Sequence, residues 1–156
     1  MDLELTIDSS LFFPDLNCKT KEEVISFLAE ELAKKGYVGD EYKTALLERE
    51  RIYPTGLPSN SFNIAIPHAD YTLVNQTTIA IGILQEPVIF YSMENVEEPL
   101  EISIVIMLAI DKPHGQIEML QRIVRIIQDD HLRQALVESY DEQSVNKLLQ
   151  YLNGGK

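Results

Sequence analysis

The sequence predicts an α/β fold in which a mixed sheet of roughly five strands is sandwiched between helices, giving three layers. Two amphipathic segments before residue 52 and three after Pro113 have helical periodicity, and short β-branched segments lie between them. One of these, residues 102–110 (ISIVIMLAI), is apolar at every position except Ser103. Such a segment is typical of a central strand covered on both faces, so we expect a helical layer on each side of the sheet.

The first helix is expected to begin after Thr20. The series Thr-Lys-Glu-Glu matches a capping box, in which Glu23 reaches back to the N-terminal cap. Apolar side chains then recur at helical spacing until Lys-Lys-Gly, which ends at Gly36 and provides a stop. A second helix is expected from Asp40 to about Arg51.

Strands are expected where β-branched residues alternate or dominate, at residues 3–7, 63–66, 77–84, 88–91 and 102–110. Residues 54–61 contain two prolines and a glycine and should form a loop. After Pro113, apolar residues recur at helical spacing as far as Ile127, and two shorter helices are expected at 130–138 and 141–152.

Composition restricts the class of protein. The chain has 156 residues, 45% of them hydrophobic, which suits a single globular domain spanning residues 1–156. Its net charge of −12 is unfavourable for binding nucleic acid or an anionic membrane surface, since both require a basic face. The single cysteine, Cys18, cannot form an internal disulfide, and no apolar stretch reaches the roughly 20 residues that span a bilayer. We therefore expect a cytoplasmic protein with no direct membrane insertion.

The sequence IAIPHAD places a histidine directly after a proline. Pro67 has a fixed φ and no N–H, so it should end the strand and present His68 on a rigid lead-in. Sites are commonly built on loops that follow strands, which favours an exposed, oriented imidazole. From these residues alone, a histidine with a purely structural role is the alternative. His68 and Asp70 could also belong to a metal site, although they supply only two of the three ligands usual for catalytic zinc.

The preceding segment RERIYPTG concentrates positive charge in an acidic chain. Arg49 and Arg51 come at the end of a helix, and guanidinium groups match phosphate oxygens in geometry. Gly56 could take a positive φ and turn backbone N–H groups toward an anion. Alternatively, both arginines only complement the helix dipole or pair with Glu48 or Glu50.

Together, RERIYPTG and IAIPH resemble the signature of the enzyme IIA domains of the bacterial sugar phosphotransferase system, in the fructose/mannitol-type superfamily. The Pro-Thr-Gly loop and the spacing to IAIPH are most similar to the galactitol-type members. The resemblance covers nearly the whole chain, from the leading pair of helices to the helix that opens near Gln116.

The resemblance implies that His68 accepts a phosphoryl group from the phosphohistidine of the histidine phosphocarrier protein and passes it to a cysteine of enzyme IIB. The sugar is then phosphorylated during transport through the membrane enzyme IIC. Arg49 matches the family's active-site arginine, which neutralises the phosphoryl oxygens, and Thr55 could donate a further hydrogen bond. The reaction needs no cofactor or metal, because the energy arrives with the phosphohistidine and neutral imidazole is the nucleophile.

The chain departs from many mannitol- and fructose-type relatives at the start of the helix after the central strand. Those relatives carry a second histidine there, whereas the matching position in this chain is Gln116, as fits the galactitol-like subgroup. The Gln116 amide could still bond to a phosphoryl oxygen or to the ring of His68. His114, two residues earlier, could approach from the same loop or be merely solvated.

The partners must reach His68, so a small apolar patch with a polar rim is expected around Ile52, Tyr53 and Leu57. Galactitol or a related polyol is the sugar that the resemblance favours, although sugar choice belongs mainly to the membrane subunit.

Three other functions stay open at this stage. The chain could be a regulatory phosphotransfer domain whose phosphorylation is read by a transcription factor or another enzyme. It could be a metal-dependent hydrolase that uses His68, Asp70 and His114. It could also be a binding module without chemistry, which the presence of both His68 and Arg49 disfavours.

Overall fold

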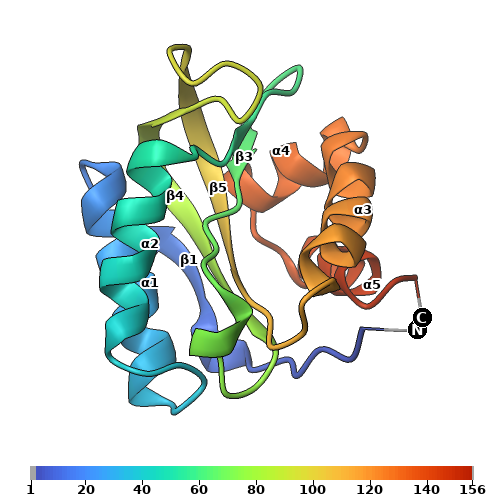
Figure 1. The fold of residues 1–156 in the computed structure, drawn as a ribbon. Coiled ribbons are helices and arrows are strands. Elements are labelled where there is room, and N and C mark those ends of the chain that lie inside the picture. The colour runs from blue at the N-terminus through green and yellow to red at the C-terminus, as the bar shows by residue number, and fades with distance from the viewer. Residues whose placement is uncertain (1–2, 156) are drawn as a thin grey trace.

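In the computed structural model, which describes residues 3–155, a mixed sheet lies between two helical layers (Figure 1). The five strands lie in the order β1-β4-β5-β3-β2, with β1/β4 and β3/β5 parallel and the other two pairs antiparallel. The predicted three-layer α/β fold is therefore confirmed. The strands are β1 (Phe12–Leu16), β2 (Gly56–Leu57), β3 (Asn63–Ala65), β4 (Thr78–Tyr91) and β5 (Pro99–Ala109).

The helices divide between the two faces of the sheet (Figure 1). One face is covered by α1 (Lys21–Lys34) and α2 (Glu41–Ile52), and the other by α3 (Gly115–Ile127), α4 (Asp130–Glu138) and α5 (Glu142–Leu152). Two 3-10 helices, η1 (Ser9–Leu11) and η2 (Tyr71–Leu73), precede β1 and β4. None of the helices between residues 3 and 155 combines the length and apolar character that crossing a membrane requires.

The start and stop signals of α1 act much as predicted. The Thr20 hydroxyl accepts the N–H of Glu23 at 3.2 Å, and Gly36 follows the helix with a φ of +81°. The Glu23 carboxylate, however, accepts the N–H of Lys19 at 3.4 Å, one residue before the expected partner. Helix α1 is therefore capped at its N-terminus by Thr20, and Gly36 ends it at its C-terminus.

The sheet separates two apolar cores, and β5 contributes to both. Alternate side chains of a strand point to opposite faces, so a strand buried on both sides is apolar throughout. The α1–α2 core takes Val105, Met107 and Ala109 from β5, and the α3–α5 core takes Ile104, Ile106 and Leu108. The expectation of helices on both faces is confirmed by this division.

The strand predictions need four corrections. Residues 3–7 form no strand; Thr6 makes only an isolated bridge to Thr78. The strand β1 was not predicted; it contains Pro14, which is tolerated because β1 lies at an edge of the sheet. The two strands expected at 77–84 and 88–91 are one strand, β4, with an irregularity between Ile83 and Val88. The segment 54–61, expected to be loop, contains the short strand β2.

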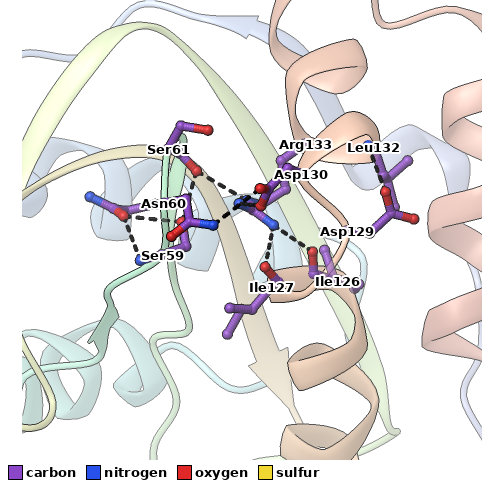
Figure 2. A network of polar contacts seen from close by, with 10 residues as sticks. Ser59, Asn60, Ser61, Ile126, Ile127, Asp129, Asp130, Leu132 and Arg133 are labelled. Carbon is purple, nitrogen blue, oxygen red and sulfur yellow. Dashed lines mark hydrogen bonds and ion pairs between the residues drawn. The ribbon is translucent and has the colours of Figure 1, made fainter.

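The loop that leads into β3 is fastened to the α3–α5 layer by one buried arginine, Arg133 (Figure 2). Its side chain is 0% exposed and donates to the carbonyl of Ser61 at 3.1 Å. Further bonds run to the carbonyls of Ile126, at 2.9 Å, and Ile127, and to the Asp130 carboxylate at 2.6 Å. These partners satisfy most of the guanidinium donors, so the buried charge is compensated and the start of β3 is rigidly placed.

Beyond β3 the chain turns at Pro67, as the sequence predicts. The strand ends at Ala65, and the Pro67 carbonyl accepts the N–H of Leu108 in β5 at 2.9 Å. Since β3 and β5 are parallel, the residues after both strands meet at one edge of the sheet. His68 follows β3 there, and α3 begins nearby after β5.

Candidate phosphoryl-transfer site

A pocket of about 310 Å³ at this edge brings four of the five predicted site residues together. Its walls come from the end of α2 and the segment between α2 and β2, from the residues after β3, from β5, from the β4–β5 loop and from the first turns of α3. Arg49, Thr55, His68 and Gln116 line it, together with Tyr53, Pro54, Ile66, Met93, Val96, Leu108, Ile117 and Leu120.

His68 is partly buried in this pocket, and its tautomer follows from one hydrogen bond. Nδ1 lies 2.8 Å from the carbonyl oxygen of Ile66. A carbonyl oxygen only accepts, so Nδ1 carries the proton and Nε2 keeps its lone pair. Burial lowers the pKa of His68 from its ordinary value, and the positive charge of Arg49 lowers it further. The site thus favours a neutral imidazole with a nucleophilic Nε2.

Arg49 is an exposed residue in the last turn of α2. Its guanidinium carbon lies 5.4 Å from the centre of the Tyr53 ring, a cation–π arrangement that orients the side chain. No ion pair joins Arg49 to another residue in the described part of the chain. A guanidinium so placed at the mouth of the pocket can take up an anion.

Thr55 is placed in the pocket wall, but its hydroxyl proton is already engaged. The hydroxyl and the N–H of Thr55 each donate to the Glu50 carboxylate at 2.8 Å. Glu50 is only 3% exposed, and this burial raises its pKa although both bonds from Thr55 oppose the shift. Thr55 is therefore arranged to hold the turn rather than to donate its hydroxyl to a ligand.

Glu50 is the residue that sequence reasoning missed, because it was considered only as a partner for neighbouring arginines. A signal was present in the spacing of α2. Glu50 lies four residues after Leu46 and eight after Tyr42, and both of these are buried. Residues at that spacing share one helix face, so the position of Glu50 points into the protein while Arg49 points out.

Gly56 does not take the positive φ that was considered for it from the sequence. Its requirement is steric: a Cβ atom at this position would lie 2.6 Å from the carbonyl oxygen of Tyr91. The Gly56 carbonyl also accepts the N–H of Met93 at 2.8 Å. A glycine is needed here because β2 passes close to the end of β4, which brings the β4–β5 loop to the pocket.

Gln116 and His114 are separated by the start of α3. The Gln116 amide donates to the carbonyl of Ala69 at 3.3 Å, directly beyond His68. His114 is exposed and lines a different cavity, of about 830 Å³, against the N-terminal segment. Only Gln116 therefore belongs to the pocket of His68.

The ligands that a metal-dependent hydrolase would need do not converge. Asp70 instead accepts the N–H and the hydroxyl of Thr72, each at 3.0 Å, at the start of η2. Between residues 3 and 155, no group of three or more His, Cys, Asp and Glu side chains is placed to hold a metal ion. The geometry gives this alternative no support.

An apolar rim surrounds the pocket. Tyr53, Val96 and Ile117 are 62%, 56% and 63% exposed, unusually high for large apolar side chains. Of the residues expected to form a docking patch, Ile52 and Tyr53 are exposed, whereas Leu57 is buried in the α3–α5 core. Val96 was not foreseen, since it reaches the pocket from the β4–β5 loop.

Comparison with known proteins shows the family of this chain. Residues 6–151 match the model of the family described as phosphoenolpyruvate-dependent sugar phosphotransferase system, EIIA 2. The chain belongs to this EIIA family. As an EIIA protein it is a phosphotransferase, the phosphoryl-transfer component of a sugar phosphotransferase system.

Individual relatives extend along nearly the whole EIIA chain. The galactitol-specific EIIA component of Escherichia coli K12 is 25% identical over 149 residues, 95% of each chain. The fructose-specific EIIA component of Haloferax volcanii is 30% identical over 132 residues, 83% of this chain and 82% of its own. Among solved structures, the complex of enzyme IIAMtl with phosphorylated enzyme IIBMtl from E. coli matches with a TM-score of 0.76 and 27% identity, covering 94% of this chain and 98% of that one.

Proposed function

We propose that Nε2 of His68 accepts a phosphoryl group from the phosphohistidine of the histidine phosphocarrier protein and passes it to the cysteine of a sugar-specific enzyme IIB. Enzyme IIB would then serve the membrane enzyme IIC during sugar uptake. The observation that carries the proposal is the bond from Nδ1 of His68 to the Ile66 carbonyl. It leaves the lone pair on Nε2, in a pocket whose mouth holds Arg49.

The chemistry balances without a cofactor. In the first step, the Nε2 lone pair forms the new N–P bond while the N–P bond of the donor breaks and its electron pair returns to the donor ring. No proton has to leave His68, because Nε2 carries none. In the second step, the thiolate sulfur of enzyme IIB attacks phosphorus and the bonding pair returns to Nε2. The Nδ1–H bond to Ile66 stays in place throughout and keeps the ring oriented.

Two side chains support this transfer in the proposal. Arg49 neutralises charge on the phosphoryl oxygens, which is the main requirement of phosphoryl transfer besides alignment. Gln116 fixes the backbone after His68 through its bond to Ala69. Thr55 supports the pocket wall through Glu50, and His114 has no assigned step because it faces the other cavity.

The apolar rim of Tyr53, Met93, Val96 and Ile117 suits transient docking of both partners. A carrier must release each partner quickly, and small interfaces with an apolar centre allow this. The solved complex of enzyme IIAMtl with phosphorylated enzyme IIBMtl, a relative in fold and sequence, supports enzyme IIB as the acceptor.

We place the reaction in the cytoplasm and treat residues 1–156 as one domain. The galactitol-specific relative favours galactitol or a related polyol as the sugar.

Phosphorylation by the carrier tests the proposal directly. Purified histidine phosphocarrier protein, charged from phosphoenolpyruvate, should transfer acid-labile phosphate to the wild-type chain and none to His68→Ala. His131→Ala, which removes an exposed histidine in α4, serves as the matched control and should be labelled at the wild-type rate. Label that persists in His68→Ala would overturn the assignment. Chase of the labelled protein with candidate enzyme IIB proteins separates sugar uptake from a regulatory role, in which no enzyme IIB takes the phosphoryl group.

A further inference from the structure

We propose that Glu50 is a positioning residue for phosphoryl transfer, which holds the ring of His68 and the guanidinium of Arg49 in a fixed relation. This inference rests on the proposed function of His68. It concerns a buried carboxylate that does not itself face the phosphoryl group.

A chain of three hydrogen bonds joins Glu50 to the His68 ring. The N–H of Thr55 donates to the Glu50 carboxylate at 2.8 Å. The Thr55 carbonyl accepts the N–H of Ile66 at 3.2 Å, and the Ile66 carbonyl accepts Nδ1–H of His68 at 2.8 Å. Since Arg49 is the neighbour of Glu50 in α2, the same attachment fixes the position of both the His68 ring and the Arg49 side chain.

Burial of the Glu50 carboxylate is energetically unfavourable, so we expect the acid at this position to have a function. A carboxylate that is 3% exposed loses most of its hydration, and no cation forms an ion pair with it in the described part of the chain. Among the described residues its hydrogen bonds come from the Thr55 N–H and hydroxyl, and the charges of Lys21 and Arg49 favour the carboxylate more weakly from a distance. An apolar residue at this position would continue the buried face of α2 formed by Tyr42 and Leu46, so packing does not require an acid here.

Arg133 provides the structural contrast (Figure 2). It is equally buried and also holds the β2–β3 hairpin, but through Ser61, at the end of β3 away from His68. Its partners lie in α3, α4 and the loop before β3, and none of them lines the pocket. A loss at Arg133 should therefore loosen the fold without a specific effect on the relation between Arg49 and His68.

The test compares transfer rates and stability in paired variants. Glu50→Ala should slow phosphoryl transfer to His68 by about 10- to 100-fold, because a misplaced reactive group costs rate steeply. Glu50→Gln should restore most of the rate, since its amide can accept the Thr55 N–H and donate to the Thr55 hydroxyl. Glu41→Ala, an exposed acid at the other end of α2, is the matched control and should transfer at the wild-type rate.

A double-mutant cycle separates positioning from general destabilisation. In an Arg49→Ala background, Glu50→Ala should slow transfer by less than about threefold, while its effect on the denaturation midpoint stays unchanged. A merely structural residue would instead give the same fold loss in both backgrounds. That outcome, or a wild-type transfer rate in Glu50→Ala, would overturn the inference.

Two further measurements keep the test decisive. If Glu50→Ala does not fold, Thr55→Val removes only the hydroxyl donor to Glu50 and should show the same coupling to Arg49, with Thr55→Ser restoring the rate. Labelling of the wild-type protein is scored first. Failure of that label refutes the proposed function, whereas normal labelling with additive Glu50 and Arg49 effects refutes only the role of Glu50.

Discussion

The two ends of β3 are held by side chains of opposite character. Before the strand, Arg133 is 0% exposed and bonds to three carbonyl groups and a carboxylate (Figure 2). After the strand, His68 makes one hydrogen bond, from Nδ1, and keeps Nε2 available, while Arg49 nearby is exposed. The guanidinium before β3 therefore has its hydrogen bonds satisfied in the interior. After β3, Nε2 of His68 has no hydrogen-bond partner among the described residues, and its ring lines a pocket.

The comparison teaches where stability and reactivity reside in this molecule. A satisfied buried charge stabilises a single arrangement, and removing its partners is expensive. In the proposed function, Nε2 of His68 at the other, reactive end of β3 must instead be left without a partner until the phosphoryl group arrives, so it can contribute little to stability. Because Arg133 holds the start of β3 rigidly, His68 after the strand can be held in a precise position.

The largest expected effect is on stability, at the end of β3 that Arg133 holds. Arg133→Met removes four charge-assisted hydrogen bonds, those from the guanidinium to three carbonyl groups and to Asp130, which should cost about 3–5 kcal/mol of unfolding free energy. Urea denaturation measures this loss, and the folded fraction should still be labelled at the wild-type rate. A specific loss of transfer with unchanged stability would break the division between the two ends.

At the reactive end, Arg49→Ala should have the reverse signature. The side chain is exposed, so unfolding should change little, whereas phosphoryl transfer should slow by about 100- to 1,000-fold through loss of charge stabilisation. Quenched assays of phosphoryl transfer from the phosphorylated carrier protein measure this rate. Transfer at the wild-type rate would show that Arg49 has no part in the reaction.

Gly56→Ala tests the close contact between β2 and the end of β4, which brings the β4–β5 loop to the pocket. The new Cβ would lie 2.6 Å from the Tyr91 carbonyl oxygen, so backbone must shift, at a cost of about 1–3 kcal/mol. Gly39→Ala is the matched control, because its Cβ meets only the mobile carboxylate end of Glu41 at the same distance. Equal losses of unfolding free energy in the two variants would contradict the steric explanation.

The smallest expected effect is the pH dependence of the reactive end. The lowered pKa of His68 means that the folded protein binds this proton less readily than the unfolded chain does. Stability from this group is therefore present above the ordinary value of 6.5 and is lost as pH falls from there toward the lowered folded pKa. Transfer should persist somewhat below pH 6.5 and then decline as Nε2 becomes protonated. NMR titration of the ring gives the pKa, and a value above 6.5 would contradict the burial argument.

Local features of the chain were predictable because their causes are local. Pro67 ends β3 through its own ring, and Thr20 caps α1 through a bond to a residue three positions away. The identity of the family also followed from short motifs around Arg49 and His68. Arg49, His68 and Gln116 were predicted from the sequence as site residues, and the structure brings all three into one pocket, while their roles in transfer stay predictions.

Features that depend on distant segments were not predictable in the same way. Val96 reaches the pocket because Gly56 and Tyr91 approach each other, a contact between residues 35 positions apart. His114 lies only two residues before Gln116, yet the start of α3 directs it to another cavity.

The sequence alone determined the fold class, the ends of several elements and the histidine–arginine pair, because hydrophobic period, proline and capping act within a few residues. Tertiary structure decided which nitrogen of His68 is free, that Thr55 serves Glu50, and that Glu50 is buried beside an exposed Arg49. These outcomes depend on which peptide groups meet across β2, β3 and α2, and hydrogen bonds between such groups form only once the layers have packed.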